Sequence, residues 1–247
     1  TGIRECDVSA PLLDPPELAV PMLAPGQQLS AEAAAARTAA QQALARWRAS
    51  LPMTFYTQVR RKFEAAGIDI HAISLFPSAT PEQFARTMDV AEALGATLVA
   101  STATLPVLRT LVPAAAARGL TVGVQGRPDM SVTNPDVVAT PERYAAAVAL
   151  GPNCRAMLDV GDATGRGWDT LQFIQEHGDT IGLIYLKDRT RDYTSVPFGR
   201  GDTPIREIVK VIRDRQYPIR CYLDCEYPSD DRTADIRQSL EYLRTAL

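Results

Sequence analysis

Histidine is scarce in this chain, which has only His71 and His177 among its 247 residues. We find no Ser-His-Asp or Cys-His arrangement for nucleophilic catalysis around either of them. His177 is typical of a helix C-terminus, where the helix dipole favours a cation. His71 stands near the end of a predicted strand and is the better candidate for a pocket residue, with a core or rim position as the alternative.

Cysteine is sparse as well. The four cysteines, at positions 6, 154, 221 and 225, lack the close spacing of a zinc site or a Cys-x-x-Cys redox motif. We interpret them as buried free thiols, which are typical of a reducing compartment.

Long apolar runs and an excess of positive charge are also missing. No run of about 18 apolar residues exists, so we predict no transmembrane helix, and no signal peptide is visible. We expect a cytoplasmic protein without a membrane partner, although the chain begins at Thr1 without a methionine and an export signal could lie upstream. The net charge of −3 gives no basic face for nucleic acid.

What the sequence does contain is a regular alternation of strand and helix patterns. Seven short apolar strands are predicted, near 3–8, 69–75, 97–101, 121–125, 156–160, 182–187 and 221–226. Helical segments separate them, including an alanine-rich helix over 30–49. This alternation indicates an α/β fold with a parallel sheet covered by helices, and the length fits one domain over residues 1–247.

Two architectures fit this alternation: a (β/α)8 TIM barrel and an open doubly wound sheet. An open sheet usually has a glycine-rich first turn, whereas the first strand here runs into Ser9-Ala10-Pro11 without glycine. We therefore predict the barrel. Its missing strand is expected to be the first one, before Thr1.

Four of the predicted strands end in polar residues: Gln125, Asp159, Tyr185 with Lys187, and Asp224 with Glu226. Side chains alternate along a strand, and the carboxyl ends of barrel strands meet at one rim, so we expect these six residues to ring one pocket. Carboxylates and an amide suit Mg²⁺ or Mn²⁺. The alternative is a set of polar plugs, in which Lys187 and Arg127 pair with the carboxylates.

The order of these motifs resembles that of a known family. The segments Val-Gly-Val-Gln (122–125), Leu-Asp-Val-Gly-Asp (158–162), Tyr-Leu-Lys-Asp-Arg (185–189), Pro-Phe-Gly-Arg-Gly-Asp-Thr-Pro (197–204) and Tyr-Leu-Asp-Cys-Glu-Tyr (222–227) together are similar to the sugar phosphate isomerase/epimerase group. These proteins are xylose-isomerase-like TIM barrels. The resemblance extends upstream to Trp47 and covers essentially the whole chain.

The resemblance implies a divalent metal, Mn²⁺ or Mg²⁺, held at four strand tips by Glu, Asp, His and Glu. Position by position, these places are taken here by Gln125, Asp159, Tyr185 and Asp224. Two ligands are changed, because an amide replaces a carboxylate and a phenol with a pKa near ~10 replaces an imidazole. The metal candidates are thus Gln125, Asp159 and Asp224, and the catalytic candidates are Tyr185, Lys187 and Glu226.

Six further residues are candidate substrate contacts: Asp162, Arg127, His71, Trp168, Asp188 and Arg200. Asp162 falls where the family has a substrate-contacting histidine. Arginines on strand-end loops, Arg189 and Arg191 included, could bind a phosphate or a carboxylate, or be ordinary surface. Trp168 could wall the pocket or pack in the core. Asp7 matches an acidic residue at an early strand end of the family.

The resemblance implies an isomerase or epimerase acting on a small sugar or keto-sugar, in which a metal ion stabilises an enediolate and Glu226 or Lys187 moves protons. A keto-sugar lyase or dehydratase shares the enediolate step. The changes at Gln125, Tyr185 and Asp162 leave open a degenerate barrel that binds a ligand or partner without metal catalysis. The nuclease relatives use a histidine-rich trinuclear zinc site, which two histidines cannot build. A homo-oligomer is compatible with the resemblance.

Overall fold

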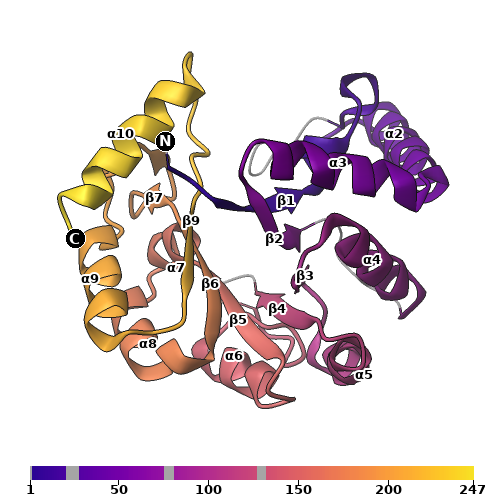
Figure 1. The fold of residues 1–247 in the computed structure, drawn as a ribbon. Coiled ribbons are helices and arrows are strands. Elements are labelled where there is room, and N and C mark those ends of the chain that lie inside the picture. The colour runs from indigo at the N-terminus through magenta and orange to yellow at the C-terminus, as the bar shows by residue number, and fades with distance from the viewer. Residues whose placement is uncertain (1, 21–27, 75–80, 127–131) are drawn as a thin grey trace.

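The computed structural model describes residues 2–20, 28–74, 81–126 and 132–247. A parallel sheet of seven strands runs through them in the order β1-β2-β3-β4-β5-β6-β9. Its strands are β1 (Glu5–Ser9), β2 (Asp69–Ser74), β3 (Leu98–Ser101), β4 (Thr121–Gln125), β5 (Cys154–Asp159), β6 (Ile181–Leu186) and β9 (Arg220–Leu223). The order follows the chain without the reversal of a doubly wound sheet, and the sheet curls into a nearly closed TIM barrel (Figure 1).

Helices follow the strands and cover the outside of the sheet (Figure 1). They are α1 (Ala10–Leu13), α2 (Ala31–Ser50), α3 (Met53–Ala65), α4 (Pro81–Leu94), α5 (Leu105–Ala116), α6 (Pro141–Val148), α7 (Val160–Gly165), α8 (Thr170–His177), α9 (Ile205–Arg215) and α10 (Arg232–Arg244), with 3₁₀ turns η1 (Pro16–Leu18) and η2 (Gly178–Thr180). The alanine-rich helix α2 begins where Ser30 Oγ accepts a hydrogen bond from the Ala33 amide. Among the described helices, none combines the length and apolarity needed to cross a membrane.

The barrel has one gap, between its two edge strands β1 and β9. No ladder joins these two strands in the described part of the chain. Arg220 at the start of β9 bridges them, because its Nε donates to Glu5 Oε2 on β1 at 2.8 Å. The predicted TIM barrel is therefore confirmed, with seven strands and a gap beside β1.

Each of the seven predicted strands overlaps an observed one, but the last strand was predicted too long. The strand β9 ends at Leu223, so Asp224 and Glu226 belong to the loop after it. A small antiparallel hairpin, β7 (Asp188–Arg189) with β8 (Ser195–Val196), was not predicted. Strands of two residues are too short to show a hydrophobic period, which needs several residues to become visible.

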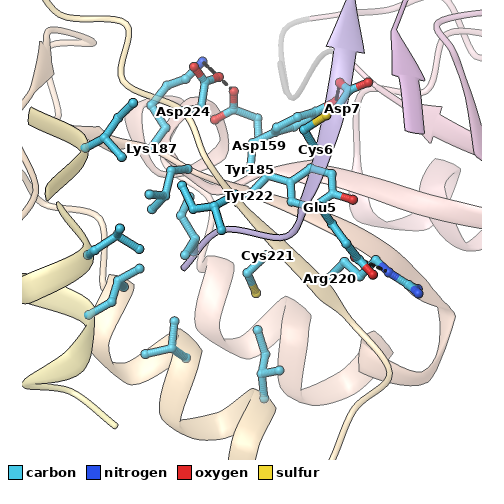
Figure 2. A pocket seen from close by; sticks show the side chains of 18 of the residues that line it. Glu5, Cys6, Asp7, Asp159, Tyr185, Lys187, Arg220, Cys221, Tyr222 and Asp224 are labelled. Carbon is cyan, nitrogen blue, oxygen red and sulfur yellow. Dashed lines mark hydrogen bonds and ion pairs between the residues drawn. The ribbon is translucent and has the colours of Figure 1, made fainter. Parts of the chain in front are cut away.

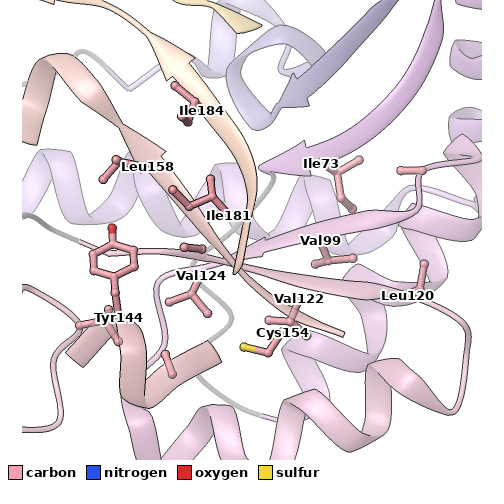
Figure 3. Close-up of a cluster of buried hydrophobic side chains, with 14 of the residues drawn as sticks. Ile73, Val99, Leu120, Val122, Val124, Tyr144, Cys154, Leu158, Ile181 and Ile184 are labelled. Atoms are coloured by element: carbon pink, nitrogen blue, oxygen red, sulfur yellow. The ribbon is translucent and has the colours of Figure 1, made fainter. Parts of the chain in front are cut away.

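Apolar side chains fill both faces of the sheet. The outer cluster lies between the sheet and the helices and includes Ile73, Val99, Val122, Leu158 and Ile184 (Figure 3). The inner cluster fills the barrel and consists of Ala72, Leu98, Ala100, Met157, Leu183 and Tyr185, with Tyr222 packed against it. Gly123 makes room for Met157, since a Cβ at position 123 would lie 2.2 Å from the Met157 sulfur. The polar strand tips therefore stand above an apolar floor.

Candidate active site

A pocket of about 1060 Å³ opens at the carboxyl ends of the strands and continues into the gap beside β9 (Figure 2). All six residues of the predicted ring line it: Gln125, Asp159, Tyr185, Lys187, Asp224 and Glu226. Asp7, Ser74 and Asp162 line it as well. The wall next to the gap is apolar and comes from α9 and α10, through Val209, Ile212, Ile236, Leu240 and Leu243.

Lys187 is the centre of the polar cluster and is 3% exposed. Its Nζ lies 2.7 Å from Asp159 Oδ2, 3.1 Å from Asp224 Oδ2 and 2.9 Å from Glu226 Oε2. An ammonium group has three N–H donors, so these three carboxylates engage all of them. Burial lowers the pKa of Lys187, but attraction to the carboxylates outweighs burial, and the net shift is upward. Lys187 is therefore a fixed positive charge.

Local geometry brings Lys187 and Asp159 together. Lys187 follows β6 directly, and Asp159 is the last residue of the neighbouring strand β5. Asp159 also caps α7, because its Oδ1 accepts a hydrogen bond from the Asp162 amide at 2.8 Å. Gly161 in the same turn lies against Lys187, and a Cβ there would be only 2.8 Å from the Lys187 carbonyl oxygen. Only glycine permits this approach.

Arg189 supplies the second cation of the cluster. It forms ion pairs with Asp162 Oδ1 at 2.8 Å and with Glu226 Oε2 at 3.0 Å, and its guanidinium lies 4.2 Å from the centre of the Tyr193 ring. Four carboxylates thus face two cations, which leaves an excess of negative charge in a partly buried place. Burial raises the pKa of Asp159 to about 6 and also raises the pKa of Asp224. Asp159 can therefore hold a proton at mildly acidic pH.

Tyr185 turns its hydroxyl toward β1. The hydroxyl donates to Asp7 Oδ2 at 2.6 Å and lies 3.0 Å from Ser74 Oγ, which donates to the same Asp7 oxygen at 2.6 Å. Asp7 Oδ1 is buried and has no hydrogen-bond partner among the described residues. Burial raises the pKa of Asp7 despite the two hydrogen bonds, which lower it. Sequence reasoning placed no function on Ser74, because a serine at a strand end carries no motif.

The side chains at the four predicted metal-ligand positions do not fit a divalent ion. Gln125 offers a neutral amide, the Tyr185 hydroxyl is bound to Asp7, and the carboxylates of Asp159 and Asp224 are bridged by the Lys187 ammonium. Magnesium and its relatives take about six oxygen ligands. Nowhere in the described chain do three or more His, Cys, Asp or Glu side chains form a group that could hold a metal. The carboxylates hold a cation supplied by the chain itself.

His71 is near the pocket without lining it. Its Nδ1 lies 2.8 Å from the Tyr222 hydroxyl, and Tyr222 is the residue that faces the pocket. Burial, with a smaller effect from Arg220, lowers the pKa of His71 to about 4. His71 is therefore uncharged at neutral pH and supports the Tyr222 ring.

Three of the other predicted substrate contacts, Trp168, Asp188 and Arg200, do not line the pocket. Trp168 is buried in the outer core, where its ring packs 5.5 Å from that of Phe173. The Asp188 carboxylate accepts hydrogen bonds from the backbone amides of the turn at 199–203, at 2.7 to 3.3 Å, and so shapes that turn. Arg200 is exposed on the same turn and does not line the pocket. Arg127 lies outside the described residues.

The chain is similar to a known protein family and to several solved structures. Residues 38–246 match the family described as xylose isomerase-like TIM barrel. No curated protein sequence matches the chain. A solved xylose isomerase domain protein from Planctomyces limnophilus is 14% identical, with a TM-score of 0.62 over 79% of this chain and 82% of that one.

Two further solved structures share the fold. An L-ribulose 3-epimerase is 14% identical, with a TM-score of 0.63 over 77% of this chain and 80% of its own. A probable 3-DHS dehydratase from Bacillus anthracis is 13% identical, with a TM-score of 0.57 over 76% of this chain and 80% of its own. At such identities the likeness demonstrates a common fold alone.

Proposed function

This chain belongs to the xylose isomerase-like TIM barrel family, and from that premise we propose an isomerase- or epimerase-type enzyme that moves a proton beside the carbonyl of a small sugar. The Lys187 ammonium takes the part of a divalent metal ion. One observation carries this proposal: the buried Lys187 Nζ lies within 3.1 Å of three carboxylates in a pocket at the strand tips. An L-ribulose 3-epimerase and a probable dehydratase of the same fold support the substrate class.

The ammonium group provides the charge that such a reaction needs. Removing a proton from the carbon next to a carbonyl leaves an enediolate, whose negative charge gathers on oxygen. A fixed positive charge in a buried site stabilises that oxygen without having to reorganise. Lys187 is such a charge, and Asp159 and Asp224 hold it in place.

A substrate oxygen gains access to Lys187 by displacing Glu226. Of the three carboxylates on Nζ, Glu226 has the most exposed side chain, at 47%, compared with 30% for Asp224 and 10% for Asp159. Glu226 also stays paired with Arg189 when it leaves Nζ, because the distance to that guanidinium is 3.0 Å. The displaced carboxylate then lies beside the bound substrate.

Glu226 is the group that moves the proton in this proposal. Its carboxylate takes the proton from the carbon, the C–H electron pair enters the enediolate, and the carbonyl oxygen accepts a hydrogen bond from Lys187. Return of the proton to the neighbouring carbon, with transfer of the hydroxyl proton from one oxygen to the other, gives an isomer. Departure of a β-hydroxyl as water, with the proton that Glu226 has taken, gives a dehydrated product. Gln125 and Asp162 line the pocket, and in this proposal they bind substrate hydroxyls.

Hydrogen exchange in D₂O tests this function. We expect the chelator-treated protein to exchange a carbon-bound proton of a ketose, such as L-ribulose or D-allulose, for deuterium. Loss of the ¹H NMR signal of that proton measures the exchange. Lys187→Met should slow exchange at least ~100-fold, the low end for loss of a positioned charge in a buried site. Lys210→Met on the exposed face of α9 is the matched control. Exchange that depends on added Mn²⁺ would contradict the role of Lys187.

A second candidate is a barrel that binds a sugar without converting it. The observation in its favour is that all three Lys187 donors are already engaged by carboxylates. Saturable binding of a ketose, seen as chemical-shift changes at the pocket, with no exchange of its carbon-bound protons would favour this candidate over the enzyme.

A further inference from the structure

We propose that Tyr193 is a positioning residue of this pocket, which holds Arg189 in place so that Arg189 can keep Glu226 beside the bound substrate. This inference rests on the proposed function and makes it more specific. Tyr193 belongs to no sequence motif and does not line the pocket, so its role would be exerted through the arginine alone.

The first support is the backbone of Tyr193. Its φ of 71° lies in the left-handed region, which residues other than glycine seldom adopt. Gln216 is the only other described non-glycine residue with a positive φ, and it ends α9, where a left-handed residue is ordinary. Tyr193 instead lies at the tip of the β7–β8 hairpin. Backbone strain of this kind is concentrated at functional sites.

The strained residue makes two contacts with one guanidinium group. The Tyr193 carbonyl oxygen accepts a hydrogen bond from Arg189 Nη1 at 2.9 Å, and the centre of the Tyr193 ring lies 4.2 Å from Arg189 Cζ. The other edges of the guanidinium face acids. Its Nε lies 2.8 Å from Asp162 Oδ1, and its Nη2 donates to Glu226 Oε2 at 3.0 Å. Tyr193 therefore fixes the orientation in which Arg189 meets Glu226.

Closing the hairpin does not require a tyrosine at this place. The turn is closed by backbone hydrogen bonds, from the Tyr193 amide to the Thr190 carbonyl oxygen at 2.9 Å and from the Thr190 amide to the Thr194 carbonyl oxygen at 3.0 Å. Glycine would make the same bonds and would adopt the left-handed conformation without strain. The ring is the part of Tyr193 that the turn does not use, and it lies on Arg189.

The Tyr193 ring is itself held against α7. A Cβ at Gly165, the last residue of that helix, would lie 2.8 Å from Tyr193 Cδ2. The Arg166 guanidinium, just after the helix, is 4.6 Å from the centre of the same ring. Asp159 caps the start of α7 and Asp162 lies in its first turn. The ring therefore rests on the helix that carries two acids of the pocket.

A fixed Arg189 matters because Glu226 has to change partners. Glu226 Oε2 lies 2.9 Å from Lys187 Nζ and 3.0 Å from Arg189 Nη2, so two cations share one oxygen. In the proposed reaction a substrate oxygen takes the place of Glu226 on Lys187, and Glu226 remains on Arg189. A guanidinium that is already fixed receives the carboxylate without being ordered first, whereas a mobile one has to be ordered when the substrate binds. Tyr193 therefore favours the substrate-bound arrangement.

Tyr193→Leu and Tyr193→Phe test this role, because leucine removes the aromatic face and phenylalanine keeps it. The probe is the ketose that the wild-type protein exchanges, L-ribulose or D-allulose. Tyr193→Leu should raise KM about 2- to 30-fold, which corresponds to the loss of one cation–π contact, and should leave kcat nearly unchanged. Tyr193→Phe should keep the wild-type KM. Tyr242→Leu is the matched control, because the Tyr242 ring lies 4.5 Å from the Arg206 guanidinium and does not line the pocket.

The Arg189 side chain gives a measurement that does not depend on turnover. Its Nε–H signal in NMR spectra, identified by its absence in Arg189→Lys, should exchange with solvent about 2- to 30-fold faster in Tyr193→Leu than in the wild type. Tyr193→Phe should exchange like the wild type. Gly165→Ala should exchange like Tyr193→Leu, because its Cβ displaces the ring without removing it.

The outcomes separate this inference from the proposed function. If Tyr193→Leu changes neither KM nor the Nε–H exchange, if it lowers kcat at an unchanged KM, or if Tyr193→Phe loses as much as Tyr193→Leu, the role of the ring is wrong while the enzyme assignment stands. If the wild-type protein exchanges neither ketose, the proposed function fails, and the contact between Tyr193 and Arg189 is judged by the Nε–H exchange alone. Melting followed by circular dichroism checks that each variant is folded.

Discussion

Lys187 Nζ lies 2.7 Å from Asp159 Oδ2, and both side chains are buried at the tips of adjacent strands. Two charges so placed lose most of their hydration, and the pair is favourable only because each has further partners. Lys187 has Asp224 and Glu226, and Asp159 has the Asp162 amide. The ion pair therefore anchors the whole polar cluster of the pocket.

Replacing Lys187 with methionine should create affinity for a divalent metal ion. The variant leaves Asp159, Asp224 and Glu226 close together without their shared cation, and it should be less stable by about 3–5 kcal/mol in metal-free buffer. Added Mn²⁺ should restore part of that stability, because a ligand that binds only the folded state stabilises it. Calorimetric titration with Mn²⁺ and urea unfolding measure both effects. Lys210→Met should show neither, and stoichiometric Mn²⁺ binding by the wild-type protein would contradict the prediction.

Replacing Gly161 with alanine should push Lys187 out of place. The new Cβ would meet the Lys187 carbonyl oxygen at 2.8 Å and its Cβ at 2.9 Å. We expect a loss of about 1–3 kcal/mol in the free energy of unfolding, typical of overpacking, together with weaker sugar exchange. Gly151→Ala is the matched control, because its nearest neighbour, a Val112 methyl group, is at 3.1 Å and far from the pocket. Equal stability of the two variants would count against the prediction.

The pH dependence of stability should reveal Asp159. Its pKa is raised to about 6 in the folded protein, mainly by burial. An acid with a raised pKa contributes stability below its unfolded pKa, near ~3.9, and this contribution is lost as the pH rises through 6. Between pH 4 and pH 7, the wild type should therefore lose about 2 kcal/mol relative to Asp159→Asn. Urea unfolding at several pH values measures the difference, and parallel curves for the two proteins would refute it.

The lowered pKa of His71 should affect the pH dependence of stability in the opposite direction to that of Asp159. Its pKa is lowered to about 4, so its contribution to stability is present above the unfolded value, near ~6.5, and is lost as the pH falls toward 4. We expect the His71 ring protons to titrate near pH 4 by NMR, with His71→Gln identifying the signals. A midpoint above pH 6 would contradict the burial of this ring against Tyr222.

The sequence predicts the barrel well because its signals are local. Apolar runs separated by helical periods identify the seven strands, and the sequential order follows from alternation alone. The strand tips also predict which side chains share a pocket, since Gln125, Asp159, Tyr185 and Lys187 occupy the expected rim. The hairpin at 188–196 and the end of β9 at Leu223 were missed. A two-residue strand and the last residues of a strand are both too short to show a hydrophobic period in the sequence.

The sequence by itself determined the family, the barrel and the residue types at the rim, because hydrophobic period and motif order are properties of neighbouring residues. Only the tertiary structure decided how those residues pair. It places Lys187 among three carboxylates, turns Tyr185 toward Asp7 and leaves one Asp7 oxygen without a partner. These contacts join residues up to 178 positions apart. Charge pairing and burial arise only when such distant groups meet in space, so they fix the electrostatics of the pocket after the fold is formed.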